Sequence, residues 1–160
     1  MVGINIWHVN DLKISHVEKK VIQDIITYLI KFGKESPLTT THGKVLEYLS
    51  MTLDYTTMGK VKICMYEYID KMLSKLPTDM NGSAMMPAAG HLFDVNSEAK
   101  KLPEATAQVF HHQVAKLLYL SRCKRQEIQT SVAFLCTRVQ APDKYDYKKL
   151  TRVTYDVPRK

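Results

Sequence analysis

The first hydrophobic pattern in the chain is typical of a β-hairpin. Residues 2–9 (VGINIWHV) are rich in β-branched and aromatic side chains, which favours a short strand. The polar pair Asn10-Asp11 interrupts this run, and residues 12–14 resume the alternation of apolar and polar positions. The pattern therefore predicts two antiparallel strands with Asn10 and Asp11 at the tip.

A helical pattern follows the hairpin. Apolar residues recur every four positions from Val17 to Leu29, which predicts a helix over residues 16–32 with one broad apolar face. Ser15 and Glu18 have the spacing of a capping box at its start, and Gly33 is placed to end it.

The next segment predicts a second hairpin and a second helix. Residues 45–53 form a strand-like run, residues 56–59 (TTMG) are typical of a turn, and residues 61–65 alternate as a returning strand. From Tyr66 to Leu76 the apolar spacing becomes helical, and Pro77 ends that pattern.

The rest of the chain predicts a connection and a helical half, so the fold class is α+β. Residues 77–103 hold three prolines and two glycines and are predicted to be a long extended linker. Apolar spacing after Glu104 predicts two helices, and a third begins near Tyr147. The predicted organisation is an α+β region at 1–76, a linker at 77–103, a helical region at 104–153 and a frayed tail at 154–160.

Composition indicates an ordinary globular protein with a basic surplus. The chain has 160 residues, of which 45% are hydrophobic and 24% charged, and its net charge is +7 with histidine neutral. That surplus is compatible with an acidic partner such as a nucleic-acid backbone. Three cysteines without CxxC spacing, and no signal peptide or apolar span, predict an intracellular protein, cytoplasmic or nuclear, with no membrane partner.

The sequence carries few conventional catalytic patterns. It has no GxGxxG, P-loop, GxSxG or HExxH motif, and its histidines and cysteines have no zinc-ligand spacing. The basic run of Arg122, Lys124 and Arg125 has two interpretations. It is either a solvated helix end whose charge suits the helix dipole, or a surface that contacts phosphates.

The polar pair at the predicted hairpin tip is the most informative feature. Template-directed polymerases hold magnesium with acidic residues at such a tip, and adjacent carboxylates help to bind two cations during phosphoryl transfer. Here the first position is Asn10, which keeps an oxygen and loses the charge, so Asp11 is the one candidate metal ligand of the pair.

Around this pair the chain resembles the reverse transcriptase of copia-type retrotransposons, part of the pol polyprotein. That family has Tyr/Phe-Val-Asp-Asp-Leu in a palm hairpin followed by a helix, and later a Tyr-Leu-Gly-Met/Ile motif, matched here by Tyr48, Leu49, Ser50 and Met51. Further matches follow in the family's order. The matching segments are residues 8–12, 48–51, 65–73, 86–87, 114–120, 125–128 and 132–138.

The resemblance implies a fold and a set of partners. It implies the end of a reverse-transcriptase palm, made of β-hairpins and a helix, followed by a helical thumb-like or connection-like half. It implies an RNA or DNA template-primer as partner, contacted near Tyr48, Leu49, Ser50 and Met51 and by the helical half with Arg122, Lys124 and Arg125. The cofactor of the intact family is Mg²⁺.

Departures from the family predict lost activity. Asn10 replaces a family aspartate, Ser50 a glycine and Gln126 a proline, and the matches begin only at the catalytic hairpin. The expectation is a truncated, inactive reverse-transcriptase domain that retains non-specific nucleic-acid binding, binds no Mg²⁺ productively and exposes a sheet edge through which it self-associates. Two alternatives remain: a co-opted, non-catalytic interaction protein, and an enzyme part completed by another chain.

Overall fold

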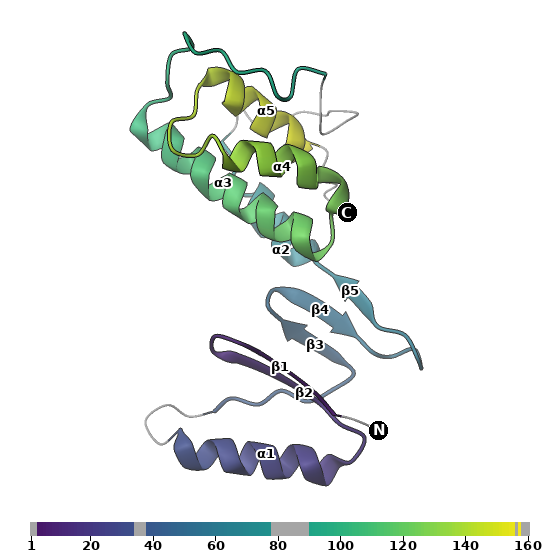
Figure 1. Ribbon diagram of the computed structural model, residues 1–160. Helices are drawn as coiled ribbons and strands as arrows, with labels where there is room; N and C mark the ends of the chain where they lie inside the picture. Colours follow the sequence, from purple (N-terminus) through teal and green to yellow (C-terminus); the bar gives the residue numbers. More distant parts are fainter. Residues whose placement is uncertain (1–2, 34–37, 78–89, 156, 158–160) are drawn as a thin grey trace. The chain divides into compact units, whose positions relative to one another are not determined.

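The computed structural model describes residues 3–33, 38–77, 90–155 and 157, and its fold is mixed α+β (Figure 1). The chain forms two compact units, an N-terminal unit of Met1–Met65 and a C-terminal unit of Tyr66–Lys160. The division falls between Met65 and Tyr66, earlier than the predicted boundary at residue 76. The helix that follows Met65 therefore belongs to the helical unit.

The described residues of the N-terminal unit form two small antiparallel sheets and one helix. Strands β1 (Ile4–His8) and β2 (Asp11–Ser15) form a hairpin, which confirms the predicted hairpin. Its turn lies one residue earlier than predicted, because His8 pairs with Asp11 and leaves Val9 and Asn10 between the strands. Helix α1 follows, and the second sheet has the order β3-β4-β5. The bounds of these later elements are α1 Lys19–Phe32, β3 Val45–Tyr48, β4 Met51–Asp54 and β5 Lys62–Cys64.

Helix α1 begins later than the sequence predicts. Its N-cap residue is Glu18, which makes no side-chain capping hydrogen bond, so the predicted capping box is wrong. Ser15 is instead the last residue of β2, opposite Ile4, and its hydroxyl accepts a hydrogen bond from Lys13 Nζ at 2.8 Å. The end of the helix is as predicted, since the Gly33 N–H donates to the carbonyl of Leu29.

The predicted strand over residues 45–53 is divided by a tight turn. Leu49 and Ser50 connect β3 to β4, with Tyr48 opposite Met51 in the register. Both turn residues have left-handed backbone angles, φ 50° and 59°, as the two central residues of a type I′ turn require. Glycine and asparagine are the usual residues there, so Leu-Ser gave no turn signal. The later turn is confirmed, with Gly59 at φ 71°.

Replacing Ser50 by glycine is expected to raise the free energy of unfolding of the N-terminal unit by roughly 0.5–1 kcal/mol. Relief of the left-handed strain, about 1–2 kcal/mol, exceeds the extra chain entropy that glycine adds to the unfolded state. Denaturant unfolding followed by fluorescence of Trp7, the one tryptophan of the chain, measures the change. Thr57→Gly is the control, because Thr57 lies in the β4–β5 turn without a positive φ. Equal changes in the free energy of unfolding at the two positions would show that the backbone at Ser50 is not strained.

The C-terminal unit is a group of helices around a continuous apolar core. Its elements are α2 (Tyr66–Leu73), α3 (Glu104–Cys123), the short 3-10 helix η2 (Gln126–Ile128), α4 (Gln129–Cys136) and α5 (Lys144–Tyr155). Helix α3 packs against η2, α4 and α5. The fully buried side chains include Phe110, Leu117, Leu120, Ile128, Val132, Leu135, Leu150 and Val153.

Helix α5 starts at Lys144, three residues before the predicted position, because Asp143 caps it. The Asp143 carboxylate accepts the backbone N–H groups of Tyr145 (2.7 Å) and Asp146 (2.9 Å). The Asp146 carboxylate in turn accepts a hydrogen bond from the backbone N–H of Asp143 at 3.2 Å, and these reciprocal bonds form a capping box. The helix continues to Tyr155, and Val157 is buried, so the prediction of fraying is wrong for these residues.

The predicted linker is partly outside the described residues, at positions 78–89. Its last part packs on the C-terminal unit, since Leu92 is buried and the Leu102 N–H donates to the carbonyl of Pro142 at 2.9 Å. A backbone bridge also joins Lys101 to Asp143. The segment before α3 therefore lies beside the start of α5.

Alkaline pH is expected to destabilise the C-terminal unit through Tyr68. Burial, and secondarily the nearby Cys123 thiol, raises the pKa of Tyr68 to about 12, and its hydroxyl donates to the Lys116 carbonyl at 3.0 Å. Because this pKa is raised in the folded state, the stabilisation is complete below about pH 10 and is lost as the pH rises through about 12.

Stability measured by circular dichroism between these pH values should fall less steeply in Tyr68→Phe than in the unmodified chain. Tyr145→Phe, at an exposed position, should keep the original slope. If stability falls equally steeply with pH in Tyr68→Phe and in the unmodified chain, groups other than Tyr68 cause the loss of stability at alkaline pH.

Candidate functional site at the first hairpin

The tip of the first hairpin has an unusual backbone. Val9 and Asn10 form the turn between β1 and β2, and Val9 has a φ of 51°. A β-branched residue in this left-handed region is a conformational outlier, since glycine is preferred at the first position of such turns. The Trp7 ring N–H donates to the Val9 carbonyl at 2.7 Å and helps to hold this conformation. Strained turns of this kind cluster at functional sites.

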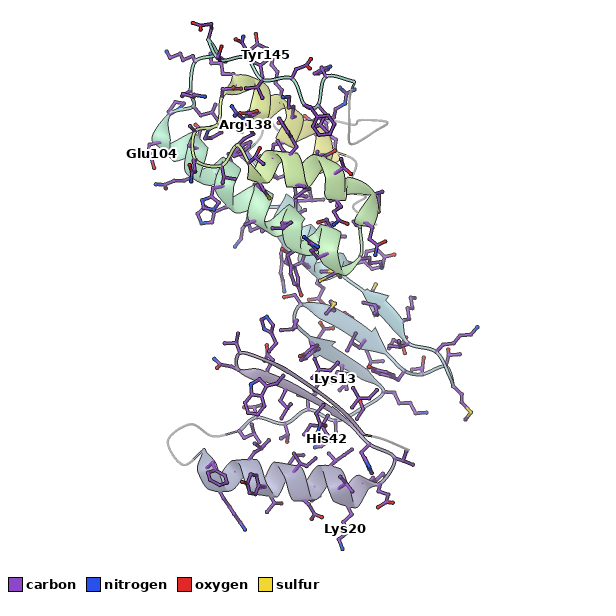
Figure 2. The ribbon with its side chains drawn as sticks, in the orientation of Figure 1. Lys13, Lys20, His42, Glu104, Arg138 and Tyr145 are labelled. Carbon is purple, nitrogen blue, oxygen red and sulfur yellow. The ribbon has the colours of Figure 1, made fainter. Side chains whose placement is uncertain are left out.

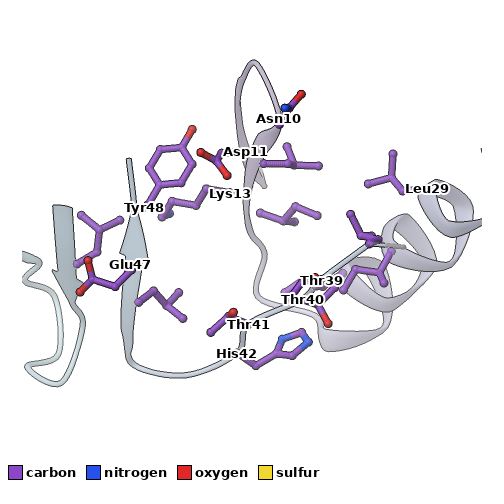
Figure 3. Close-up of a pocket in the computed structure, with 17 residues that line it drawn as sticks. Asn10, Asp11, Lys13, Leu29, Thr39, Thr40, Thr41, His42, Glu47 and Tyr48 are labelled. Atoms are coloured by element: carbon purple, nitrogen blue, oxygen red, sulfur yellow. The ribbon is translucent and has the colours of Figure 1, made fainter. Parts of the chain in front are cut away.

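The two polar side chains of the tip point in different directions. Figure 3 shows the Asp11 carboxylate on the side of Tyr48, with the Asn10 amide on the other side of the hairpin. This divergence follows from the alternation of side chains along a strand. Asn10 and Asp11 both line a cleft of about 250 Å³, but their oxygens do not converge on one point within it.

The cleft combines a polar rim with an apolar floor. Helix α1 and strands β3 and β4 contribute the floor, which includes Ile22, Ile26, Leu29, Leu46 and Leu53. The rim carries Asp11, Lys13, Glu47 and Tyr48, together with the segment 39–42 (TTTH). Both charge signs are present, so the cleft has no single electrostatic preference.

Lys13 and Tyr48 are positioned by contacts within the N-terminal unit. Besides its bond to Ser15, the Lys13 ammonium lies 5.3 Å from the centre of the Tyr55 ring. The Tyr48 hydroxyl donates to the Ile6 carbonyl at 3.3 Å and so links β3 to β1. Asp11 and Tyr48, which the sequence analysis assigned to separate motifs, are thereby brought into one cleft.

The remaining predicted nucleic-acid contacts of this unit occupy the second tight turn. Leu49 and Ser50 are its two central residues, and Met51 begins β4. Of the predicted set, only Tyr48 lines the cleft.

The predicted basic contacts lie in the C-terminal unit. Arg122 is exposed in the last turn of α3, and Lys124 follows it with its ammonium 5.5 Å from the centre of the Tyr66 ring. Arg125 forms an ion pair with Glu127. Although burial opposes the shift, hydrogen bonds from its own N–H and from Arg125 hold the pKa of Glu127 below its ordinary value. Lys124 and Arg125 therefore already have intramolecular partners.

The two-magnesium centre that the resemblance implies for the intact family makes a specific demand on the side chains around Asp11. Such a centre needs several converging oxygen ligands. Among the described residues, no group of three or more His, Cys, Asp or Glu side chains is arranged to hold a metal ion. Asp11 therefore belongs to no such group of three in the part of the chain that the structure describes.

Several residues of the cleft carried no recognisable signal in the sequence. Thr39, Thr40, Thr41 and His42 follow α1 in a segment without regular structure, and Glu47 lies in β3. Neither spacing nor motif connects them to Asp11, because their proximity depends on how the hairpin, α1 and β3 pack together.

Comparisons with known proteins leave the function to be inferred from the chain itself. Protein-family models, curated protein sequences and solved structures give no match. In the described part of the chain, no helix is long and apolar enough to cross a membrane.

Proposed function

We propose that this chain is a remnant of a copia-type reverse transcriptase that lacks polymerase activity and retains non-specific affinity for nucleic acid. The observation that carries the proposal is the strained hairpin in which Asn10 ends the turn and Asp11 begins β2, where the family resemblance expects the catalytic pair. A helix and a second tight hairpin with Tyr48 and Met51 follow in the family's order. The N-terminal unit then corresponds to the end of a palm, and the C-terminal unit to a thumb-like or connection-like part.

The lack of activity follows from charge. Nucleotide addition requires cations that stabilise both the attacking and the leaving oxygen, and those cations need several carboxylates. In this hairpin the neutral Asn10 amide diverges from the single Asp11 carboxylate. The proposed family cofactor, Mg²⁺, therefore lacks a site that would position it for catalysis.

The retained affinity follows from the basic surplus. With a net charge of +7, the chain is attracted to a polyanion at low ionic strength, and release of condensed counterions makes such binding sensitive to salt. The interaction is expected to depend on the backbone and to show little preference for sequence.

The test combines binding and extension on the full chain. Affinity for a labelled RNA–DNA primer–template is measured between about 50 and about 200 mM salt, and primer extension is assayed with magnesium and nucleotides. We expect binding that weakens steeply with salt, and no extension. Asp11→Asn serves as the control, because extension that persists in this variant comes from a contaminating polymerase. Extension that requires Asp11 would overturn the proposed inactivity.

A co-opted interaction protein is the second candidate, and strand β1 favours it. Among the described strands β1 pairs only with β2, and Ile4, Ile6 and Trp7 are exposed along it. An unprotected strand edge of this kind is a template for pairing with another chain, such as a second copy. A folded sample that self-associates in sedimentation measurements, and does not bind the primer–template, would favour this candidate over the first.

A further inference from the structure

Helix α5 borders a groove that the sequence analysis did not assign. Leu102, from the segment before α3, lines it together with Lys144, Tyr147, Lys148 and Thr151 of α5, and its volume is about 350 Å³. The four α5 residues recur at spacings of three and four, so they share one face of the helix. All of them belong to the C-terminal unit.

The acidic residues at the start of α5 point away from solvent. Asp143 and Asp146 are each 1% exposed, and both carboxylates lie near the guanidinium of Arg138, at 3.7 and 3.0 Å. Figure 2 labels Arg138 beside α5 in the C-terminal unit. These two negative charges are therefore neutralised by Arg138 and contribute little to the electrostatic potential at the surface of α5.

The exposed charges of α5 are cations at every fourth position. Lys144, Lys148 and Arg152 are all exposed, and this spacing places them along one side of the helix, which we call the α5 stripe. The stripe spans about 12 Å at 1.5 Å per residue. Asp156, four positions after Arg152, follows the end of α5 and lies outside the described residues.

Helix stability accounts for Arg152, a cation in the last turn of α5, but not for the two lysines of the α5 stripe. Like charges four positions apart destabilise a helix by a few tenths of a kcal/mol, and a cation in the first turn opposes the helix dipole. Lys144 and Lys148 are such a pair, and Lys144 is the first residue of α5. The arrangement gains free energy when an anion lies along it.

We propose that the α5 stripe and its groove bind the phosphate backbone of a nucleic acid; this inference rests on the proposed function and locates its binding surface. Lysine ammoniums contact phosphates as point charges, and Lys144 and Lys148 also line the groove. Tyr145 is 51% exposed, and its ring centre lies 5.8 Å from the Lys148 ammonium, so an aromatic face adjoins the cations. Along about 12 Å of duplex axis, which is the length of the stripe, one strand carries three or four phosphates.

The same face is poorly suited to a membrane surface. A helix that lies on a lipid bilayer inserts large apolar side chains. The apolar residues Leu150 and Val153 of α5 are fully buried in the core of the unit. Helix α5 therefore offers an anionic lipid no exposed aliphatic anchor beside the charges of the stripe.

The decisive experiment compares two charge-matched variants of the full chain. One is Lys144→Gln/Lys148→Gln/Arg152→Gln. The other removes three exposed lysines of α1, as Lys19→Gln/Lys20→Gln/Lys31→Gln, so that both variants carry a net charge of +4 by removing three cations from +7. Binding of a labelled primer–template is measured by fluorescence anisotropy against salt, after circular dichroism has established that each variant is folded.

The α5 variant should bind about tenfold more weakly or worse at about 100 mM salt, and its slope of log K against log salt should be shallower by about 2–3. The α1 variant should change affinity by less than about threefold. Equal losses of affinity in the two variants, or no loss of affinity in the α5 variant, would show that the α5 stripe is not the binding surface and would leave the proposed function intact. A parent chain that fails to bind would overturn the proposed function itself. Tighter binding to phosphatidylserine vesicles than to the primer–template, lost in the α5 variant, would identify a lipid surface instead.

Discussion

Replacing Asp146 by alanine should lower the free energy of unfolding of the C-terminal unit by about 3 kcal/mol. Removal of one member of a buried ion pair costs about 3–5 kcal/mol because the other charge stays desolvated. Here Arg138 is 19% exposed and keeps Asp143 at 3.7 Å, which places the cost at the lower end. Urea unfolding followed by helical circular dichroism measures it.

Asp146 has several partners, so its role differs from that of a surface carboxylate. Its Oδ2 accepts from Arg138 Nε at 3.0 Å and from the Asp143 N–H at 3.2 Å, while Lys149 Nζ lies 4.0 Å from Oδ1. Alanine would therefore remove an ion pair and half of the capping box of α5 together.

A double-mutant cycle separates these effects. Arg138→Ala/Asp146→Ala should cost less than the sum of the two single variants, since the double variant leaves no unpaired Arg138 charge. Asp70→Ala, at an exposed position in α2, is the matched control and should change stability by less than about 0.5 kcal/mol. Additive single effects, or an equal cost at Asp70, would show that the buried network does not stabilise the unit as described.

The sequence predicted those parts of the fold that local chemistry determines. The alternation around Asn10 and Asp11 predicted the first hairpin, and the apolar spacing predicted α1, α2 and α3. Local rules failed where a neighbouring strand competes for the same residue. Ser15 has the side chain of a helix cap, yet it is paired in β2. The turn at Leu49 and Ser50 was missed because neither residue favours a positive φ.

The candidate sites were less predictable, because both depend on non-local packing. The cleft beside Asp11 needs a segment more than twenty-five residues away in sequence, around His42, to fold back against the hairpin. The α5 stripe stands out only once Asp143 and Asp146 are found buried against Arg138, since the sequence alone interleaves acids and bases there. The family resemblance supplies a hypothesis about polymerase ancestry, and the binding and extension measurements test the function proposed from it.

Replacing Phe110 by alanine should lower the free energy of unfolding of the C-terminal unit by about 3–5 kcal/mol, the largest effect of any single change considered. Phe110 is fully buried in α3, the helix that packs against η2, α4 and α5. Truncation loses the transfer free energy of the ring and leaves a cavity that these helices fill only in part.

Phe93→Ala is the control for this substitution within the same unit. Phe93 is 62% exposed, and its edge-to-face contact with Phe134, at 5.6 Å between ring centres, is worth about 1 kcal/mol. Helical circular dichroism should therefore shift strongly in Phe110→Ala and weakly in Phe93→Ala. Trp7 lies in the other compact unit, so the unfolding transition seen by its fluorescence should be unchanged in both variants. If both signals shift together in Phe110→Ala, the two units unfold as one cooperative structure. A loss of unfolding free energy no larger than that of Phe93→Ala would contradict the central place of Phe110 in the core.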